Sequence, residues 1–227
     1  MYIVFEGIVG SGKTTQIHRL QEYLSEDYPN RKIIVTREPG GDLVADEIRR
    51  IAQNVGFDGE LDPTCEAYLY AASRSQTLRT VVVPALMEGG IVISDRSYLS
   101  SLAFQGEARG LPFEVIRSIN EVATSIVTPD LVIFFDVDIE NGLSRVKISD
   151  PARGEEDKFE AYDIEFFRRV QEGYDKALVL PELEGRVERI DANRGIDEVF
   201  EDLKQVVEGR IFRESKPERV EYKFYGF

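Results

Sequence analysis

The chain has 227 residues, and its 42% of hydrophobic and 31% of charged residues predict one folded domain with a sizeable core, which excludes a wholly disordered protein. Its 28 Lys and Arg stand against 42 Asp and Glu, a formal net charge of −14, which argues against sequence-independent binding to nucleic acid. A single Cys and a single His exclude an intramolecular disulfide framework and a Cys/His structural zinc site.

The first residues, MYIVFEG, are typical of a strand and lack the basic flank and cleavage site of a secretory signal. No apolar run further along approaches the roughly 20 residues that span a bilayer. We therefore expect a cytoplasmic protein that has neither a membrane nor a nucleic acid as its partner.

Strand-like and helix-like segments alternate from one end of the chain to the other. Five apolar, β-branched runs are expected to form strands, at Tyr2–Phe5, Lys32–Thr36, Gly90–Ser94, Asp130–Val137 and Val187–Ile190. Four of them are apolar almost throughout, as are the strands of a parallel sheet that is covered on both faces. Helical spacing at Thr14–Leu24 and Phe113–Ile126 indicates crossover helices, so the pattern predicts a doubly wound α/β fold.

The most specific short motif lies between the first strand and the first helix. Residues Gly7–Thr14 read GIVGSGKT and fit the phosphate-loop pattern G-x-x-x-x-G-K-[ST], whose backbone N–H groups surround phosphate oxygens. Lys13 is expected to reach the β- and γ-phosphates of ATP, and the Thr14 hydroxyl to bind Mg²⁺. The fold prediction becomes a P-loop NTPase-type, five-stranded parallel sheet flanked by helices. The predicted ATP-binding residues of the loop are Gly7, Ile8, Val9, Gly10, Ser11, Gly12, Lys13, Thr14 and Thr15.

A second candidate lies at the end of the third predicted strand. Asp95 and Arg96 directly follow Gly90–Ser94, and doubly wound sheets bind their ligands at the carboxyl ends of strands. Asp95 is predicted to hold the water shell of the metal ion, and Arg96 to bind an oxyanion through its planar guanidinium. A surface ion pair is the alternative interpretation of this dipeptide.

Two segments stand apart from the alternating pattern. Residues 149–160, SDPARGEEDKFE, are polar without a core pattern and predict a surface loop. From residue 210 onward the composition shifts to aromatic and basic side chains. We therefore expect one domain over residues 1–209 and an appended tail over residues 210–227.

Longer motifs connect the chain to one known family. In chain order they are FEGIVGSGKTTQ from Phe5, TREPGG from Thr36, YAASRSQ from Tyr70, SDRSYLSSLAFQG from Ser94, PDLVIFFDV from Pro129 and DKFEAYDIEFFRRVQEGY from Asp157. Together they resemble the thymidylate kinases of the nucleoside monophosphate kinase group, over nearly the whole chain except the tail. The resemblance implies phosphoryl transfer from ATP to dTMP in dTTP biosynthesis, with Mg²⁺ as the metal ion and a homodimer as the assembly.

The resemblance also implies roles for residues on the acceptor side. Tyr70 matches an aromatic residue that stacks on thymine, although a core-facing aromatic is the alternative interpretation. Arg74 matches an Arg directed at the carbonyl edge of the base, and Phe104 a residue that disfavours a ribose 2′-hydroxyl. Arg49 matches a contact to the acceptor monophosphate, and Arg96 a residue beside the transferred phosphoryl group. The implied substrate-binding residues are Glu38, Arg49, Tyr70, Arg74, Arg96, Ser101, Phe104 and Gln105.

The polar loop over residues 149–160 resembles the lid that covers the ATP phosphates in this family. Because the phosphate loop carries no Arg, the resemblance implies that Arg153 stabilises charge on the transferring phosphoryl group, with Lys158 as a second candidate. Simple solubility is the alternative role of these charges. Arg145 matches an Arg that packs on adenine. The implied catalytic residues are Lys13, Arg96, Arg153 and Lys158, and the implied metal ligands are Thr14 and Asp95.

Val9 departs from the family pattern, which has Asp or Glu at this position to meet the 3′-hydroxyl of the acceptor. The valine side chain neither accepts a hydrogen bond nor binds an ion. Deoxynucleoside kinases, whose loop reads EGNIGSGKS, have Ile at this place, so a deoxynucleoside kinase is one alternative function. A nucleotide-binding regulatory module with weak turnover is the other alternative.

Overall fold

Five parallel strands form the centre of the molecule. The computed structural model describes residues 1–53, 61–148 and 163–214, and its strands are β1 (Tyr2–Glu6), β2 (Ile33–Arg37), β3 (Ile91–Asp95), β4 (Leu131–Asp136) and β5 (Val187–Asp191). Their order across the sheet is β2-β3-β1-β4-β5, and every pairing is parallel. The predicted fold class is confirmed, and each expected strand is present with bounds within one residue of those expected.

Burial along each strand follows its place in the sheet. β1, β3 and β4 lie in the middle and are buried along nearly their whole length, which explains their near-continuous apolar sequences. β5 lies at an edge and exposes the charged side chains of Glu188 and Arg189. The one run that is less apolar in sequence therefore forms one of the two edge strands.

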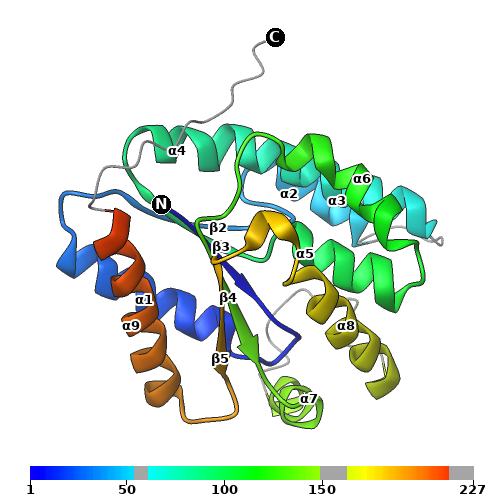
Figure 1. The fold of residues 1–227 in the computed structure, drawn as a ribbon. Helices are drawn as coiled ribbons and strands as arrows, with labels where there is room; N and C mark the ends of the chain where they lie inside the picture. Colours follow the sequence, from blue (N-terminus) through cyan, green and yellow to red (C-terminus); the bar gives the residue numbers. More distant parts are fainter. Residues whose placement is uncertain (54–60, 149–162, 215–227) are drawn as a thin grey trace.

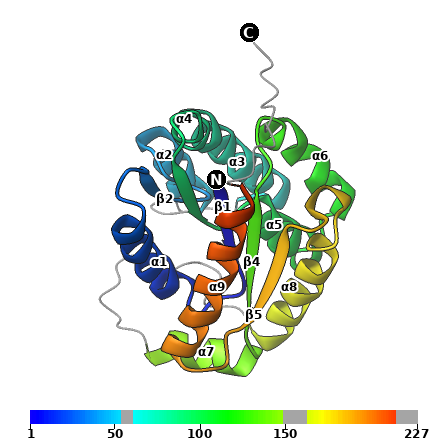
Figure 2. The same cartoon turned by 60° about the vertical axis from the view of Figure 1, so that its left-hand side comes forward.

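Helices lie on both sides of the sheet, as Figures 1 and 2 show. One side carries α1 (Lys13–Asp27) and α9 (Ile196–Glu214), which pack against each other and against the strands. The other side carries α3 (Pro63–Thr77), α5 (Tyr98–Ser101), α6 (Phe113–Thr124) and α8 (Ile164–Ala177). The helices expected over residues 14–24 and 113–126 correspond to α1 and α6.

Shorter elements complete the crossovers. η1 and η2 are π-helical segments, which are frequent at functional sites, and η2 packs along α8. None of the helices in the described ranges is long and apolar enough to cross a membrane. The remaining elements are α2 (Leu43–Ala52), η1 (Leu78–Val82), α4 (Val83–Met87), η2 (Leu102–Ala108), α7 (Ile139–Ile148) and η3 (Pro181–Leu183).

Acidic side chains determine where three of these helices begin. Asp42, Asp62 and Asp163 each accept hydrogen bonds from backbone N–H groups in the first turn of α2, α3 and α8. Pro63 follows Asp62 and presets a helical φ at the first position of α3. Such caps each stabilise a helix by about 1 kcal/mol. They place α2 and α3, which carry several of the acceptor-side residues expected from the sequence.

The last helix continues past the domain boundary expected at residue 209. α9 extends to Glu214 because its apolar spacing does: Leu203, Val207 and Ile211 recur at every fourth position and are buried. The first residues of the expected tail are therefore helical. The rest of that tail, residues 215–227, lies outside the described residues, as does the expected lid at residues 149–160.

Candidate active site

A cleft of about 1010 Å³ lies at the carboxyl ends of the strands, where parallel α/β sheets bind ligands. The phosphate loop, the turns after β2, β3 and β5, and helices on both sides of the sheet form its walls. The predicted residues Arg153 and Lys158 lie outside the described residues. The predicted residues that line the cleft are Val9, Gly10, Ser11, Gly12, Lys13, Thr14, Thr15, Glu38, Arg49, Tyr70, Arg74, Asp95, Arg96, Phe104, Gln105 and Arg145.

The phosphate loop closes around the side chain of Lys13. Its Nζ donates hydrogen bonds to the carbonyl oxygens of Gly7 and Ile8, both at 2.9 Å, and to Ser11 Oγ at 3.1 Å. Among the predicted loop residues, Gly7 and Ile8 thus contribute through their backbone. Lys13 is also the first residue of α1, so a fixed ammonium group lies beside a helix N-terminus. Both features favour the binding of an anion.

The phosphate loop packs against α7 through two glycines. Gly10 has a φ of 71°, and a Cβ atom at this position would lie 2.0 Å from the carbonyl oxygen of Gly142. A Cβ atom at Gly142 would in turn lie 2.8 Å from the carbonyl oxygen of Val9. No side chain fits at either position, so the loop and α7 touch backbone to backbone. The sequence analysis did not single out Gly142, which lies outside the loop motif.

The turn after β3 holds Asp95 and Arg96 at the floor of the cleft. Asp95 Oδ1 is buried and accepts no hydrogen bond from the described residues. Arg96 has a φ of 74°, which is uncommon for a residue other than glycine. Its backbone N–H donates to the carbonyl oxygen of Phe5 at 2.9 Å, and its own carbonyl oxygen accepts from Ser94 Oγ at 2.8 Å. These two bonds stabilise a backbone conformation that costs free energy by itself.

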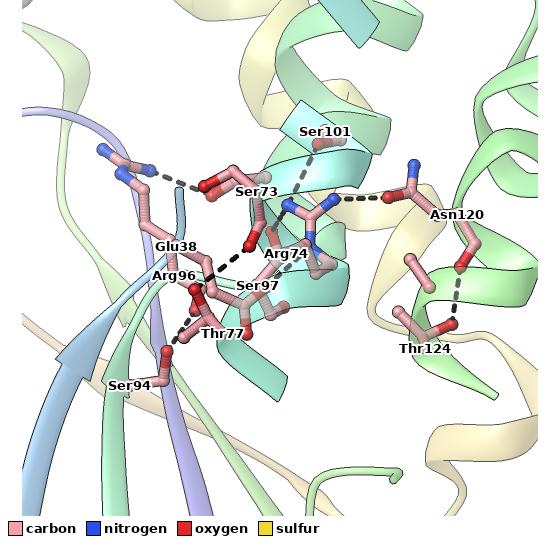
Figure 3. A network of polar contacts seen from close by, with 12 residues as sticks. Glu38, Ser73, Arg74, Thr77, Ser94, Arg96, Ser97, Ser101, Asn120 and Thr124 are labelled. Carbon is pink, nitrogen blue, oxygen red and sulfur yellow. Dashed lines mark hydrogen bonds and ion pairs between the residues drawn. The ribbon is translucent and has the colours of Figure 1, made fainter. Parts of the chain in front are cut away.

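Arg74, on α3, is the centre of a buried polar network beside the cleft, shown in Figure 3. Its Nε lies 2.6 Å from Glu38 Oε2, and both side chains are only 1% exposed. Its Nη1 donates to Asn120 Oδ1, and its Nη2 to the carbonyl oxygen of Ser97 at 3.0 Å and to Ser101 Oγ at 3.2 Å. The guanidinium is therefore fixed by four residues from three segments: the turn after β2, α5 with its N-cap, and α6.

Two of the predicted substrate-binding residues act on Arg74 in this network. Ser101 is buried and contacts Arg74, and it is not among the residues that line the cleft. Glu38 lines the cleft and also accepts a hydrogen bond from the Tyr2 hydroxyl at 2.8 Å. Burial raises the pKa of the Glu38 carboxyl, whereas Arg74 and the Tyr2 hydroxyl act in the opposite direction. The ionised pair therefore depends on keeping every partner in place.

A second buried carboxylate orients Gln105. The Gln105 Nε2 donates to Glu66 Oε1 at 2.9 Å, and the other oxygen of Glu66 lies 2.6 Å from Arg109 Nη1. Glu66 is fully buried, so its charge requires these partners. Gln105 lies beside Phe104 on η2, and both line the cleft. With the amide nitrogen bonded to Glu66, the amide oxygen of Gln105 can accept a hydrogen bond from a ligand.

Tyr70 and Arg49 come from the neighbouring helices α3 and α2. Tyr70 belongs to the hydrophobic core and also lines the cleft, so its place in the core does not keep it from the ligand-binding surface. Arg49 Nη1 donates to the carbonyl oxygen of Pro39 at 3.0 Å, which holds the guanidinium beside the turn after β2. Arg37 and Asp46, which form an ion pair at 3.1 Å, also line this part of the cleft and were not predicted.

The turn after β5 lines the opposite end of the cleft, beside Arg145 of α7. Arg145 Nη1 donates to the carbonyl oxygen of Ala192 at 2.9 Å, and Nη2 to that of Asn193 at 3.4 Å. This turn was not predicted, although residues that follow a parallel strand lie at the ligand-binding edge by the same rule that indicated Asp95. The residues of this turn and of the start of α9 that line the cleft are Ala192, Arg194, Gly195, Ile196 and Val199.

The fold and the cleft together define a class of protein. A parallel sheet in this order, with a phosphate loop between β1 and α1 and an Asp at the end of the adjacent strand β3, belongs to a P-loop protein that binds a nucleoside triphosphate. The cleft also extends beyond the loop, to the side chains of Tyr70 and Gln105. Its volume lies at the upper end of the range for ligand sites, which leaves room for a second ligand.

The chain belongs to the thymidylate kinase family, because residues 5–203 match the family model described as thymidylate kinase. It is 40% identical to a thymidylate kinase of Maridesulfovibrio salexigens over 214 residues, which cover 93% of this chain and 96% of that protein. It is 41% identical to a thymidylate kinase of Clostridium novyi over 203 residues, which cover 89% and 96% of the two chains. The crystal structure of thymidylate kinase from Ehrlichia chaffeensis superposes with a TM-score of 0.71 at 31% identity, covering 92% of this chain and 98% of that one. The resemblance inferred from the motifs is confirmed, and the chain is a kinase of this family.

Loss of the Arg74 charge is expected to destabilise the protein strongly. Arg74→Met leaves Glu38 buried without its cation, which should lower the free energy of unfolding by about 3–5 kcal/mol. Urea unfolding with an unchanged m-value measures the loss. The matched control is Arg50→Met, which removes an exposed Arg that pairs with Glu47, and it should cost less than about 1 kcal/mol.

The double variant Arg74→Met with Glu38→Gln separates two contributions to the loss of stability: the unpaired charge of Glu38 and the lost packing of Arg74. It should recover part of the stability, because no ionised group is then left without its partner. A cost below about 1 kcal/mol for Arg74→Met alone would contradict this account of the pair.

Proposed function

We propose that the protein transfers the γ-phosphoryl group of ATP to dTMP, giving ADP and dTDP, as a step of dTTP biosynthesis. One observation carries the proposal: a single cleft joins the phosphate loop to Arg49, Tyr70 and Arg74. ATP on the loop and a nucleoside monophosphate at the other end would meet beside Arg96. Membership of the thymidylate kinase family supports dTMP as the acceptor.

The chemistry needs positioning and charge neutralisation more than proton transfer, because the acceptor phosphate is already a nucleophile at neutral pH. Lys13 would bind the β- and γ-phosphates from the centre of the loop. Arg96 would bind the γ-phosphoryl group while it is transferred. We further propose that Arg153 stabilises charge on that group, with Lys158 as the second candidate, and that Arg145 packs on adenine. The loop residues from Gly7 to Thr15 would bind the phosphates through their backbone N–H groups.

On the acceptor side, we assign the monophosphate to Arg49 and the base to Tyr70, Arg74 and Gln105. The amide oxygen of Gln105 can accept a hydrogen bond from a base N–H, because its amide nitrogen is bonded to Glu66. Thymine presents such an N–H beside a carbonyl group, which Arg74 can approach. The other proposed acceptor-side residues are Glu38 and Ser101, which act through Arg74, and Phe104, which would exclude a ribose 2′-hydroxyl.

The residues near the loop fit a Mg²⁺ ion. Thr14 offers a hydroxyl at the start of α1, and Asp95 a carboxylate with an oxygen that accepts no hydrogen bond from the described residues. Both are the hard oxygen donors that Mg²⁺ prefers. When bound, the ion would neutralise charge on the ATP phosphates. The described ranges hold no group of three or more His, Cys, Asp or Glu that could bind a metal ion alone, which agrees with an ion held partly by the nucleotide.

The deoxynucleoside kinase alternative is not favoured. Such an enzyme needs a carboxylate base beside a neutral hydroxyl, and Glu6 is the carboxylate next to the loop. Glu6 is fully buried, and its two oxygens accept hydrogen bonds from Ser97, Ser100 and Tyr174. It is therefore poorly suited to take a proton from a substrate. The family relationship also does not favour a nucleotide-binding regulatory module with weak turnover.

We also propose a homodimer in the cytoplasm, where its substrates ATP and dTMP would be found. The family resemblance implies a dimer that packs through helices alongside the sheet. Exposed apolar side chains on the neighbouring helices α3 and α6 support such a surface: Tyr68 is 60% exposed and Val122 is 74% exposed.

The proposed reaction is tested by a coupled assay of ADP release with dTMP, with thymidine and without an acceptor. We expect ADP release when dTMP is the acceptor, and none with thymidine or without an acceptor. Lys13→Ala should lower kcat by about 10²–10³-fold, since it removes a cation placed where charge develops. The exposed Lys32, which pairs with Glu88, gives the matched control Lys32→Ala, which should retain wild-type kcat. Turnover with thymidine in place of dTMP would establish the deoxynucleoside kinase instead.

The valine in the phosphate loop predicts how the acceptor sugar is recognised. A site that binds a hydroxyl through a polar group strongly rejects the analogue without it, whereas Val9 has no polar group to leave unpaired. We therefore expect 3′-deoxy-dTMP to be used with a kcat/KM within about tenfold of that for dTMP, less than about 1.4 kcal/mol of discrimination. Steady-state kinetics with both acceptors measures the ratio. A hundredfold preference for dTMP would show that another group binds the 3′-hydroxyl.

The dimer is tested by light scattering after gel filtration. The wild-type chain should elute with twice the mass of one chain, and Val122→Glu should shift it toward one chain, because a charge in an apolar interface is costly. Val179→Glu, at another exposed valine outside α3 and α6, is the matched control and should leave the mass unchanged. A wild-type chain that elutes as a monomer at tens of micromolar would overturn the proposed assembly.

A further inference from the structure

Glu6 is a buried charge for which the proposed reaction has no direct use. It lies at the end of β1, immediately before the phosphate loop, and is fully buried. Its Oε1 accepts a hydrogen bond from Ser97 Oγ at 2.7 Å, and its Oε2 accepts from Ser100 Oγ at 2.7 Å and from the Tyr174 hydroxyl at 2.9 Å. A carboxylate placed here at such a desolvation cost, with three donors from two other elements, calls for an explanation.

Two of these three hydroxyls, those of Ser100 and Tyr174, also contact Arg96. The two N–H groups of Arg96 Nη1 are shared among three acceptors: Ser100 Oγ at 3.1 Å, the Tyr174 hydroxyl at 3.0 Å and the carbonyl oxygen of Gly7 at 3.1 Å. Each hydroxyl therefore accepts from the guanidinium and donates to Glu6, as one hydroxyl can do at the same time. We call Ser100 and Tyr174 the hydroxyl relay between Arg96 and Glu6.

The relay is rigid because Tyr174 has little freedom to move. Its side chain is fully buried on α8, with its ring 5.1 Å from the ring of Phe134 and 6.3 Å from that of Phe104, between centroids. Burial raises the pKa of the Tyr174 phenol, and the charge of Glu6 raises it further. The phenol thus stays protonated and donates a hydrogen bond to Glu6. The Arg96 guanidinium carbon also lies 5.2 Å from the centroid of the Phe104 ring, which faces the cleft.

We propose that Glu6 is a positioning residue that, through Ser100 and Tyr174, holds the Arg96 guanidinium in the orientation required at the transferred phosphoryl group. The inference rests on the proposed function for the role of Arg96 and adds how that role is maintained. A free Arg side chain loses about 2 kcal/mol of rotamer entropy when a ligand orders it. A guanidinium that the relay already orders does not lose this entropy during turnover. The free energy of its contact with the transition state is therefore not reduced by that cost.

Kinetics of relay variants test the proposal. Tyr174→Phe and Ser100→Ala should each lower kcat about tenfold and leave the KM values for ATP and dTMP within about threefold of wild type. Tyr98→Phe is the matched control, since it removes another buried phenol hydroxyl that makes no contact with Arg96 or Glu6 among the hydrogen bonds of the described residues, and it should retain wild-type kcat. Relay variants with wild-type kcat would overturn the proposal.

A double-mutant cycle distinguishes positioning from general loss of structure. In an Arg96→Met background, Tyr174→Phe should lower the residual kcat by less than about twofold, because the group it positions is already absent. If Tyr174→Phe lowers kcat tenfold in both backgrounds, the relay does not act through Arg96 and the proposal fails.

A third measurement needs no substrate and so stands apart from the proposed reaction. The guanidinium ¹⁵N–¹H signal of Arg96, assigned by its loss in Arg96→Met, should exchange its protons at least tenfold faster in Tyr174→Phe and in Glu6→Gln than in wild type and Tyr98→Phe. Unchanged exchange in both Tyr174→Phe and Glu6→Gln would overturn the inference, whatever the enzyme phosphorylates. Absence of wild-type turnover with dTMP would overturn only the proposed function.

Discussion

The hydrogen bond from the backbone N–H of Arg96 to the carbonyl oxygen of Phe5 joins the ends of β1 and β3, and the arrangement of the cleft depends on it. β1 and β3 are parallel and in register, so the chain leaves both strands at the same edge of the sheet. One strand continues into the phosphate loop and the other into Asp95 and Arg96. The phosphate loop and Arg96 are therefore adjacent because of backbone pairing, before any side chain contributes.

Buried carboxylates then orient the side chains that line the cleft. Glu38 pairs with Arg74, Glu66 binds the amide of Gln105, and Glu6 contacts Arg96 through two hydroxyls. Buried charges of this kind contribute little net stability, because desolvation offsets most of the attraction to their partners. Their effect is to restrict each cleft group to one orientation. Burial of these charges thus costs free energy of folding, but it leaves the polar groups of the site ordered before any ligand binds.

The parts of this molecule that the sequence could predict are those encoded locally. The strands and the phosphate loop follow from short runs of residues, and Asp95 follows from its place at a strand end. The partners of Arg74 could not be predicted, because Glu38 and Asn120 lie 36 and 46 residues away and meet it only in the folded chain. Tyr174 was hidden for a related reason: at its position in α8 an aromatic residue is typical of the core, and only the tertiary structure places its hydroxyl on Glu6.

The backbone contact between Gly10 and Gly142 has a consequence for how this protein tolerates change. The phosphate loop is usually treated as a self-contained motif that can be altered, or transplanted to another scaffold, as one segment. Here its shape is completed by a helix more than a hundred positions further along the chain, because α7 approaches the loop at Gly142, where a side chain would clash with the loop backbone. In a library of random variants, position 142 should be as intolerant of larger residues as the loop itself, and any design that borrows the loop must carry this part of α7 with it.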